Sequence, residues 1–138
     1  MQQLMTKESL DKFLNKEFPQ VSKNFKILNV SDQSFSMLMY ITEEHLRPGA
    51  TVSGPTMFLL ADVTIYLATL SIIGPKRLTD TTNCSINFLR KPNEKNLTSK
   101  ARILKLGKTL SVGDVLIYSE DIDEPVAHAS LTYSIPQK

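Results

Sequence analysis

The sequence SGPTMFLLADVTIYLATLSII, residues 53–73, decides the fold of this chain. Ser53 followed by a glycine and Pro55 is typical of a helix start, because proline lacks an N–H that the first turn would leave unpaired. Gly74 and Pro75 are typical of a helix end. The residues between them are apolar on nearly every side. The segment is therefore predicted to be a helix of about five turns, buried in a core.

Asp62 is the one charged residue between Arg47 and Lys76. A carboxylate inside an apolar helix is costly unless it is paired or has a chemical role. A membrane-spanning helix is one alternative, since the length approaches the lower limit for a span, but a central aspartate and several hydroxyl residues count against it. A structural aspartate that bonds a neighbouring strand or loop is the other. We take the third interpretation, a functional carboxylate, as the main hypothesis.

The bulk composition favours one domain that spans residues 1–138. The 16 Lys and Arg residues nearly balance the 14 Asp and Glu residues, which argues against a dedicated nucleic-acid binder. Cys84 is the single cysteine, so no intramolecular disulfide is possible, and a reducing compartment is expected. The first residues lack the pattern of a secretory signal. We therefore expect a soluble, cytoplasmic protein without a membrane partner.

The order of the remaining elements predicts a curved antiparallel sheet around the apolar helix, an α+β fold. Residues 7–18 have the spacing of a short amphipathic helix. Gly113 indicates a bulge in its strand, and alternation predicts that Thr82, Cys84, Ile86 and Phe88 share one strand face. The predicted strands cover residues 25–30, 34–40, 81–90, 97–106, 109–119 and 126–135, and residues 42–51 form a polar loop.

Three stretches carry a resemblance to a known family: HLRPGATVSGP at residues 45–55 followed by FLLAD at 58–62, TTNCSINFLRKP at 81–92, and LGKT at 106–109. Together they resemble the hot-dog fold acyl-CoA thioesterases of the phenylacetate-degradation type. In that family a His, an Asn two residues later and a His-Gly-Gly lead into the helix, and an Asp lies nine residues after the second His. His45, Gly54 and Asp62 match this pattern, whereas Arg47 and Ser53 replace the Asn and the second His.

The resemblance implies a hot-dog fold, in which the sheet wraps around one long central helix, and a thioesterase that releases a free acid and coenzyme A. Gly54 is then the donor to the thioester oxygen at the helix start, since Pro55 has no N–H. Asp62 acts as a general base on water or attacks the thioester directly, and the sequence leaves both open.

Gly54 and Asp62 are eight residues apart, which is about 12 Å along a helix. Both must lie about 3 Å from the reacting group, so one chain cannot supply both. Two antiparallel helices that meet across a two-fold axis can, with Gly54 from one chain and Asp62 from the other. The spacing thus predicts a homodimer with two shared sites, alone or as half of a homotetramer.

Other candidate residues have a functional and a structural interpretation. Ser53 places a water or bonds the carbonyl, or is only a helix cap. Thr81 and Thr82 help to hold the water, or only build their strand. His45 holds the loop, and Arg47 beside the site would weaken Asp62 as a base if the two paired. The candidates for the coenzyme A phosphates, each otherwise a surface charge, are Arg90, Lys91 and Lys108.

The leading hypothesis is an acyl-CoA thioesterase with no cofactor, coenzyme A being part of the substrate, and with no metal site. An acyl-CoA or lipid-binding hot-dog protein without turnover is the alternative, favoured by Ser53 and Arg47. An assembly protein whose helix only builds an oligomer is a third possibility. His128 is expected to point outward without a role, and Cys84 to lie in the core.

Overall fold

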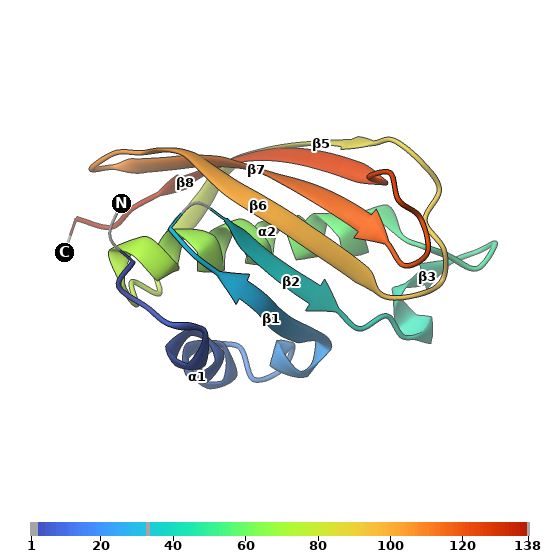
Figure 1. Ribbon diagram of the computed structural model, residues 1–138, viewed down its shortest axis with the longest axis horizontal. Coiled ribbons are helices and arrows are strands. Elements are labelled where there is room, and N and C mark those ends of the chain that lie inside the picture. The colour runs from blue at the N-terminus through green and yellow to red at the C-terminus, as the bar shows by residue number, and fades with distance from the viewer. Residues whose placement is uncertain (1–2, 33, 138) are drawn as a thin grey trace.

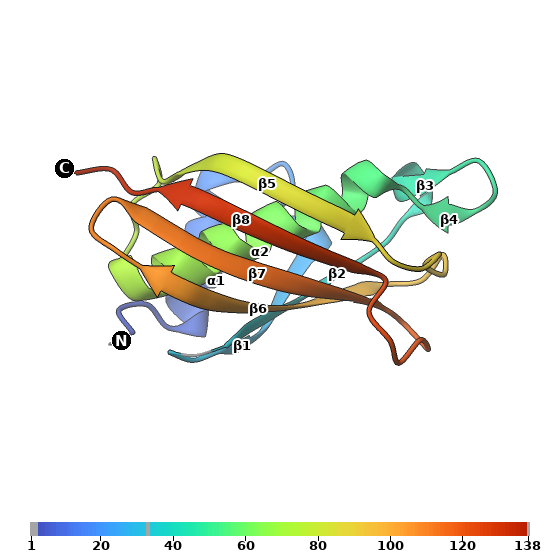
Figure 2. The same cartoon turned by 90° about the horizontal axis from the view of Figure 1, so that it is seen from above.

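The computed structural model, which describes residues 3–32 and 34–137, has one long helix held in a curved sheet (Figure 1). The sheet has six antiparallel strands in the order β1-β2-β6-β7-β8-β5. Helix α2, Gly54–Ile73, runs across its concave face, and α1, Lys7–Glu17, lies beside β1 (Figures 1 and 2). The predicted α+β arrangement of a sheet wrapped around a central helix is confirmed.

The strands fall close to their predicted positions. β5 ends two residues before its predicted end, because the backbone N–H groups of Leu89 and Arg90 turn to the carbonyl of Val126. The predicted loop at residues 42–51 contains a short 3₁₀ helix and a two-stranded hairpin, β3–β4, that projects from the end of the domain (Figure 2). The strands are β1 Phe25–Val30, β2 Phe35–Met39, β3 Leu46–Arg47, β4 Thr51–Val52, β5 Asp80–Phe88, β6 Leu97–Leu106, β7 Leu110–Ser119 and β8 Ala127–Ser134.

Helix α2 begins and ends as its sequence predicts. The Ser53 hydroxyl caps the first turn by accepting the N–H of Thr56, and Gly74, with a φ of 94°, closes the last turn on the carbonyl of Leu70. The helix is long and apolar enough to cross a membrane by length and composition alone. However, 72% of its most apolar window is buried inside the domain, as expected for the core helix of a globular fold.

The two irregularities of the sheet set which side chains face α2. In the β5–β8 pair the register shifts between Thr81 and Asn83. Thr81 consequently shares the inner face with Cys84, whereas Thr82 is exposed and donates to the carbonyl of Thr132. The prediction that Thr82 shares a face with Cys84 is wrong, because an extra residue in a strand reverses the alternation.

The bulge predicted at Gly113 lies on the opposite strand. The register of β6 against β7 shifts between Ile103 and Lys105, across from Gly113. A Cβ on Gly113 would lie 2.7 Å from the backbone oxygen of Arg102 and 2.9 Å from Cδ1 of Ile65. Glycine is needed here because it lets α2 and the neighbouring strand approach closely.

Candidate functional site

Asp62 lies half-buried on α2 and is held by two hydroxyl groups from the sheet. Thr81 Oγ1 donates to Asp62 Oδ1 at 2.7 Å. The single proton of the Tyr133 hydroxyl is shared between the same Oδ1 and the Asp62 backbone carbonyl. Thr81 and Tyr133 face each other directly across the β5–β8 pair. Within residues 3–32 and 34–137, Asp62 forms no ion pair, so the chain itself does not pair it with Arg47.

A pocket of about 420 Å³ opens beside the Asp62 carboxylate. Leu59, Val63 and Tyr66 of α2 form one wall, and Phe18 and residues near it form another. The rings of Phe18 and Tyr66 pack in a T-shaped arrangement with 5.7 Å between their centroids, which connects the segment after α1 to the site. The pocket therefore combines a mainly apolar lining with three charged groups, Asp62, Arg77 and Asp80. Apolar walls with a few polar groups are the usual composition of a small-molecule site.

A second pocket, of about 710 Å³, lies at the start of α2 and contains Gly54. A Cβ on Gly54 would lie 3.2 Å from Cζ of Phe88, so glycine brings the backbone close to this wall. In the first turn, Ser53 takes the N–H of Thr56, and Pro55 has none. In the described part of the chain this leaves the Gly54 N–H at the positive end of the helix dipole with no acceptor.

Gly54 and Asp62 thus line two different pockets of the same chain. Their separation of eight helical residues, about 12 Å, keeps the N–H donor and the carboxylate apart within one chain.

His45 and Ser53 hold the entry to α2. His45 is buried; its Nδ1 accepts the N–H of Thr42 at 2.9 Å, and its backbone carbonyl accepts the N–H of Ser53 at 2.9 Å. The Ser53 hydroxyl lies 2.8 Å from that of Thr56 and 3.3 Å from its backbone nitrogen. These contacts make His45 a support of the loop and Ser53 the cap of the helix.

The basic candidates fall into two groups. Arg47, Arg90 and Lys91 all line the pocket that contains Gly54. Arg90 also donates to the carbonyl of Pro125 and pairs with Glu124 at 3.2 Å. Lys108 lies in the β6–β7 hairpin at the opposite end of the sheet from β3, so the chain does not bring it to this pocket (Figure 1).

Tyr133 is the site residue that the sequence interpretation missed. Alternation along its strand places it on the inner face and indicates nothing more. Burial, together with the charge of Asp62 and the hydrogen bond to it, raises the pKa of Tyr133 far above its usual range. Because a buried tyrosine hydroxyl needs a partner, pairing this residue with the one carboxylate of the core helix could have found it.

Two further side chains complete the surroundings. Cys84 was expected in the core but is only half-buried and packs against it. Burial and then the nearby charge of Asp62 raise the pKa of its thiol. His128 is not isolated on the outer sheet face, since its Nε2 lies 3.1 Å from Asp114, which Arg102 also binds. Among the described residues, no three His, Cys, Asp or Glu side chains form a group that could hold a metal ion.

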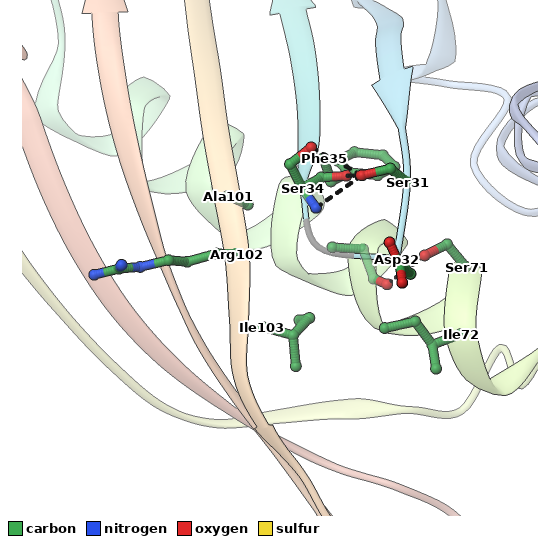
Figure 3. Close-up of a pocket in the computed structure, with 10 residues that line it drawn as sticks. Ser31, Asp32, Ser34, Phe35, Ser71, Ile72, Ala101, Arg102 and Ile103 are labelled. Atoms are coloured by element: carbon green, nitrogen blue, oxygen red, sulfur yellow. Dashed lines mark hydrogen bonds between the residues drawn. The ribbon is translucent and has the colours of Figure 1, made fainter. Parts of the chain in front are cut away.

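A third pocket lies away from Asp62, between the β1–β2 connection and the last turn of α2 (Figure 3). Ser31 and Ser34 bond to each other there, and Ser71 and Ile72 of α2 lie beside them. Its volume of about 10 Å³ is no larger than one water requires. It is therefore too small for an organic substrate.

The family of the chain follows from comparison with known proteins. A model of the thioesterase superfamily matches residues 49–126, more than half of the chain, and this range contains Gly54, Asp62 and Thr81. The chain belongs to the thioesterase superfamily. No curated protein matches it.

Solved structures agree with this assignment. A candidate thioesterase from Silicibacter sp. TM1040 is 45% identical over 99% of this chain and 95% of its own, with a TM-score of 0.91. Thioesterase superfamily member 2 of zebra fish is 16% identical over 96% of this chain and 100% of its own, with a TM-score of 0.84. A variant of the phenylacetic acid degradation protein PaaI from Thermus thermophilus is 20% identical over 86% of this chain and 99% of its own, with a TM-score of 0.74.

The two more distant structures show the shared hot-dog fold alone. The superfamily match and the Silicibacter structure go further and support thioesterase activity in general.

Proposed function

We propose that this protein is an acyl-CoA thioesterase whose two sites are each shared by two copies of the chain. One observation carries the proposal: Asp62 is the single charged residue on an apolar helix, and it lies in the wall of a pocket with two hydroxyl groups holding one of its oxygens. A held carboxylate beside an apolar pocket suits attack on an acyl carbonyl.

The exposed side of α2 supports a second copy. Pro55, Phe58, Leu59, Asp62 and Val63 follow the helical spacing of one face, and the chain's own sheet leaves all five exposed or half-buried. Phe58 is 40% exposed, which is unusual for the core helix of a domain.

The edge of the sheet beside this face is also open. β5 pairs with β8 on one side and with no strand of the described chain on the other. Phe88 at its end is 53% exposed. An open strand edge next to an apolar helix face suits a two-fold interface with a second copy.

In such a dimer the two central helices run antiparallel, and Gly54 of one copy lies near Asp62 of the other. Asp62 takes the proton of a water that attacks the thioester carbonyl, or its carboxylate attacks first and water then cleaves the mixed anhydride. The Gly54 N–H stabilises the negative charge that develops on the carbonyl oxygen. In the first route the C–S bond breaks after water has added to the carbonyl; in the second it breaks as the anhydride forms, before water attacks. In both, coenzyme A leaves as a thiolate that takes up a proton.

The two pockets suit the two parts of the substrate. The pocket beside Asp62 has apolar walls for the acyl group. The pocket at Gly54 carries Arg47, Arg90 and Lys91, whose charges suit the phosphates of coenzyme A. In the proposed dimer the thioester would lie where the Asp62 pocket of one copy meets the Gly54 pocket of the other.

An acyl-CoA-binding protein without turnover is the second candidate. Ser53 stands where the family has a histidine, and its hydroxyl is hydrogen-bonded to Thr56 as the cap of α2. This favours the second candidate, because that hydroxyl is then not free to act on a substrate. Binding would then need the pockets but not the carboxylate.

Release of coenzyme A from short, medium, long and aromatic acyl-CoAs separates the two candidates. We expect hydrolysis by the unmodified protein and a loss of at least about 100-fold in Asp62→Asn, which keeps the shape and removes the charge. Asp123→Asn, at an exposed position away from both pockets, is the matched control and should retain full activity. Acyl-CoA binding without hydrolysis by the unmodified protein would favour the second candidate.

A further inference from the structure

The hydroxyl of Tyr133 lies at the centre of the Asp62 surroundings. Tyr133 is only 2% exposed, and its strand β8 lies between β7 and β5, so its backbone is paired on both sides. The ring of Tyr66 packs against it at 6.1 Å between centroids. A side chain held by a strand inside the sheet and by an aromatic neighbour has little freedom to move.

The donors around Asp62 distinguish its two carboxylate oxygens. Oδ1 accepts hydrogen bonds from the hydroxyl groups of Thr81 and Tyr133. A carboxylate oxygen offers about two lone-pair sites, so these donors occupy Oδ1. No described residue donates to Oδ2.

We propose that Tyr133 is a positioning residue that holds Asp62 through Oδ1 and so makes Oδ2 the oxygen that acts on the substrate. The inference rests on the proposed thioesterase function for its kinetic consequence. Donors to the charged form stabilise the ionised carboxylate. A fixed carboxylate also keeps its reactive oxygen within reach of the thioester or its water, and small displacements there reduce the rate strongly.

Tyr133→Phe tests the proposal, since it removes the hydroxyl and keeps the ring. We expect kcat to fall about 10- to 100-fold, with KM within about two-fold because the pocket wall is unchanged. Tyr118→Phe is the matched control, because Tyr118 is half-buried on β7, where Lys100 Nζ lies 4.9 Å from its ring. An unchanged kcat in Tyr133→Phe, while Asp62→Asn is inactive, would overturn the proposal.

A second measurement does not depend on activity. The Tyr133 hydroxyl proton is buried against a carboxylate, so we expect a slowly exchanging, downfield proton resonance that correlates with the labelled Tyr133 ring. It should shift upfield in Asp62→Asn, where the acceptor is neutral, and remain in Tyr118→Phe.

These outcomes separate the inference from the proposed function. A protein that releases no coenzyme A from any acyl-CoA would end the proposed function, and the resonance would still decide whether Tyr133 holds Asp62. If the chemical shift of the Tyr133 hydroxyl proton is the same in Asp62→Asn as in the unmodified protein, the inference is overturned, whether or not the protein is active. The same spectrum decides the case if Tyr133→Phe does not fold.

Discussion

Gly54→Pro should remove the donor to the thioester oxygen while the residue before it keeps its conformation. Ser53 has φ −72° and ψ 154°, the extended conformation that a residue before proline prefers. Proline is also well tolerated at the first position of a helix. The substitution deletes one N–H group, and the restriction that Pro55 imposes on a side chain at residue 54 applies equally to an alanine there. Loss of one such donor reduces kcat by about 100- to 1,000-fold, or about 2.7–4 kcal/mol of transition-state stabilisation.

Gly54→Ala is the control that isolates this effect. Both substitutions add a Cβ that meets Phe88 Cζ at 3.2 Å, but only alanine keeps the N–H. The Phe88 ring is 53% exposed and can move by the few tenths of an ångström required. Rates of coenzyme A release should therefore differ by about 100-fold or more between the two variants. Equal losses in both would refute the assignment of Gly54 as the donor.

Mixing two inactive variants tests whether the site is shared. Gly54→Pro and Asp62→Asn homodimers each lack an intact site. Random exchange of copies makes half of the dimers mixed, and each mixed dimer has one site with neither substitution. About one quarter of the original activity should return. If tagged copies show that mixed dimers have formed and no activity returns, then one chain supplies both groups and the shared geometry is refuted.

Two further predictions concern stability. Gly113→Ala should lower the free energy of unfolding by about 2–3 kcal/mol, because the added Cβ would lie 2.7 Å from the Arg102 backbone oxygen. Thermal melts measure this, with Gly107→Ala as the matched control, because there the added Cβ would come no closer than 3.6 Å to any neighbour. Burial raises the pKa of Asp114, but Arg102 and His128 lower it more, so it lies below 3.8. Asp114→Asn should thus cost about 1–2 kcal/mol at pH 7, and urea titrations should show this difference disappearing as the pH falls below 3.8; a difference that persisted there would contradict the assignment.

Much of the fold could be predicted because its signals are local. Caps and prolines mark both ends of α2, and alternation marks most strand positions, so the bounds of β1 and β6 are as predicted. The β3–β4 hairpin was missed because its strands have two residues each. Its turn places Gly49 and Ala50 in the left-handed region, at φ 99° and 57°, which glycine favours and alanine does not.

The site was only partly predictable because its contacts depend on register. The charge conflict in α2 identified Asp62 from the sequence alone. Its partner Tyr133 lies 71 residues further along, and their meeting depends on β8 pairing with β5 in one particular register. The bulge that brings Thr81 rather than Thr82 to the carboxylate is likewise a property of that pair. Neither contact has a signal within a short window of sequence.

Helix α2 is more apolar than its burial within one chain requires, and this difference links assembly to function. A helix that is apolar on every side is expected to be covered on every side. Its own sheet covers one side and leaves the face with Phe58, Leu59, Asp62 and Val63 partly open. We infer that a second copy supplies the missing cover. The same contact would bring a helix start to Asp62, so the interface that stabilises the helix would also complete the site.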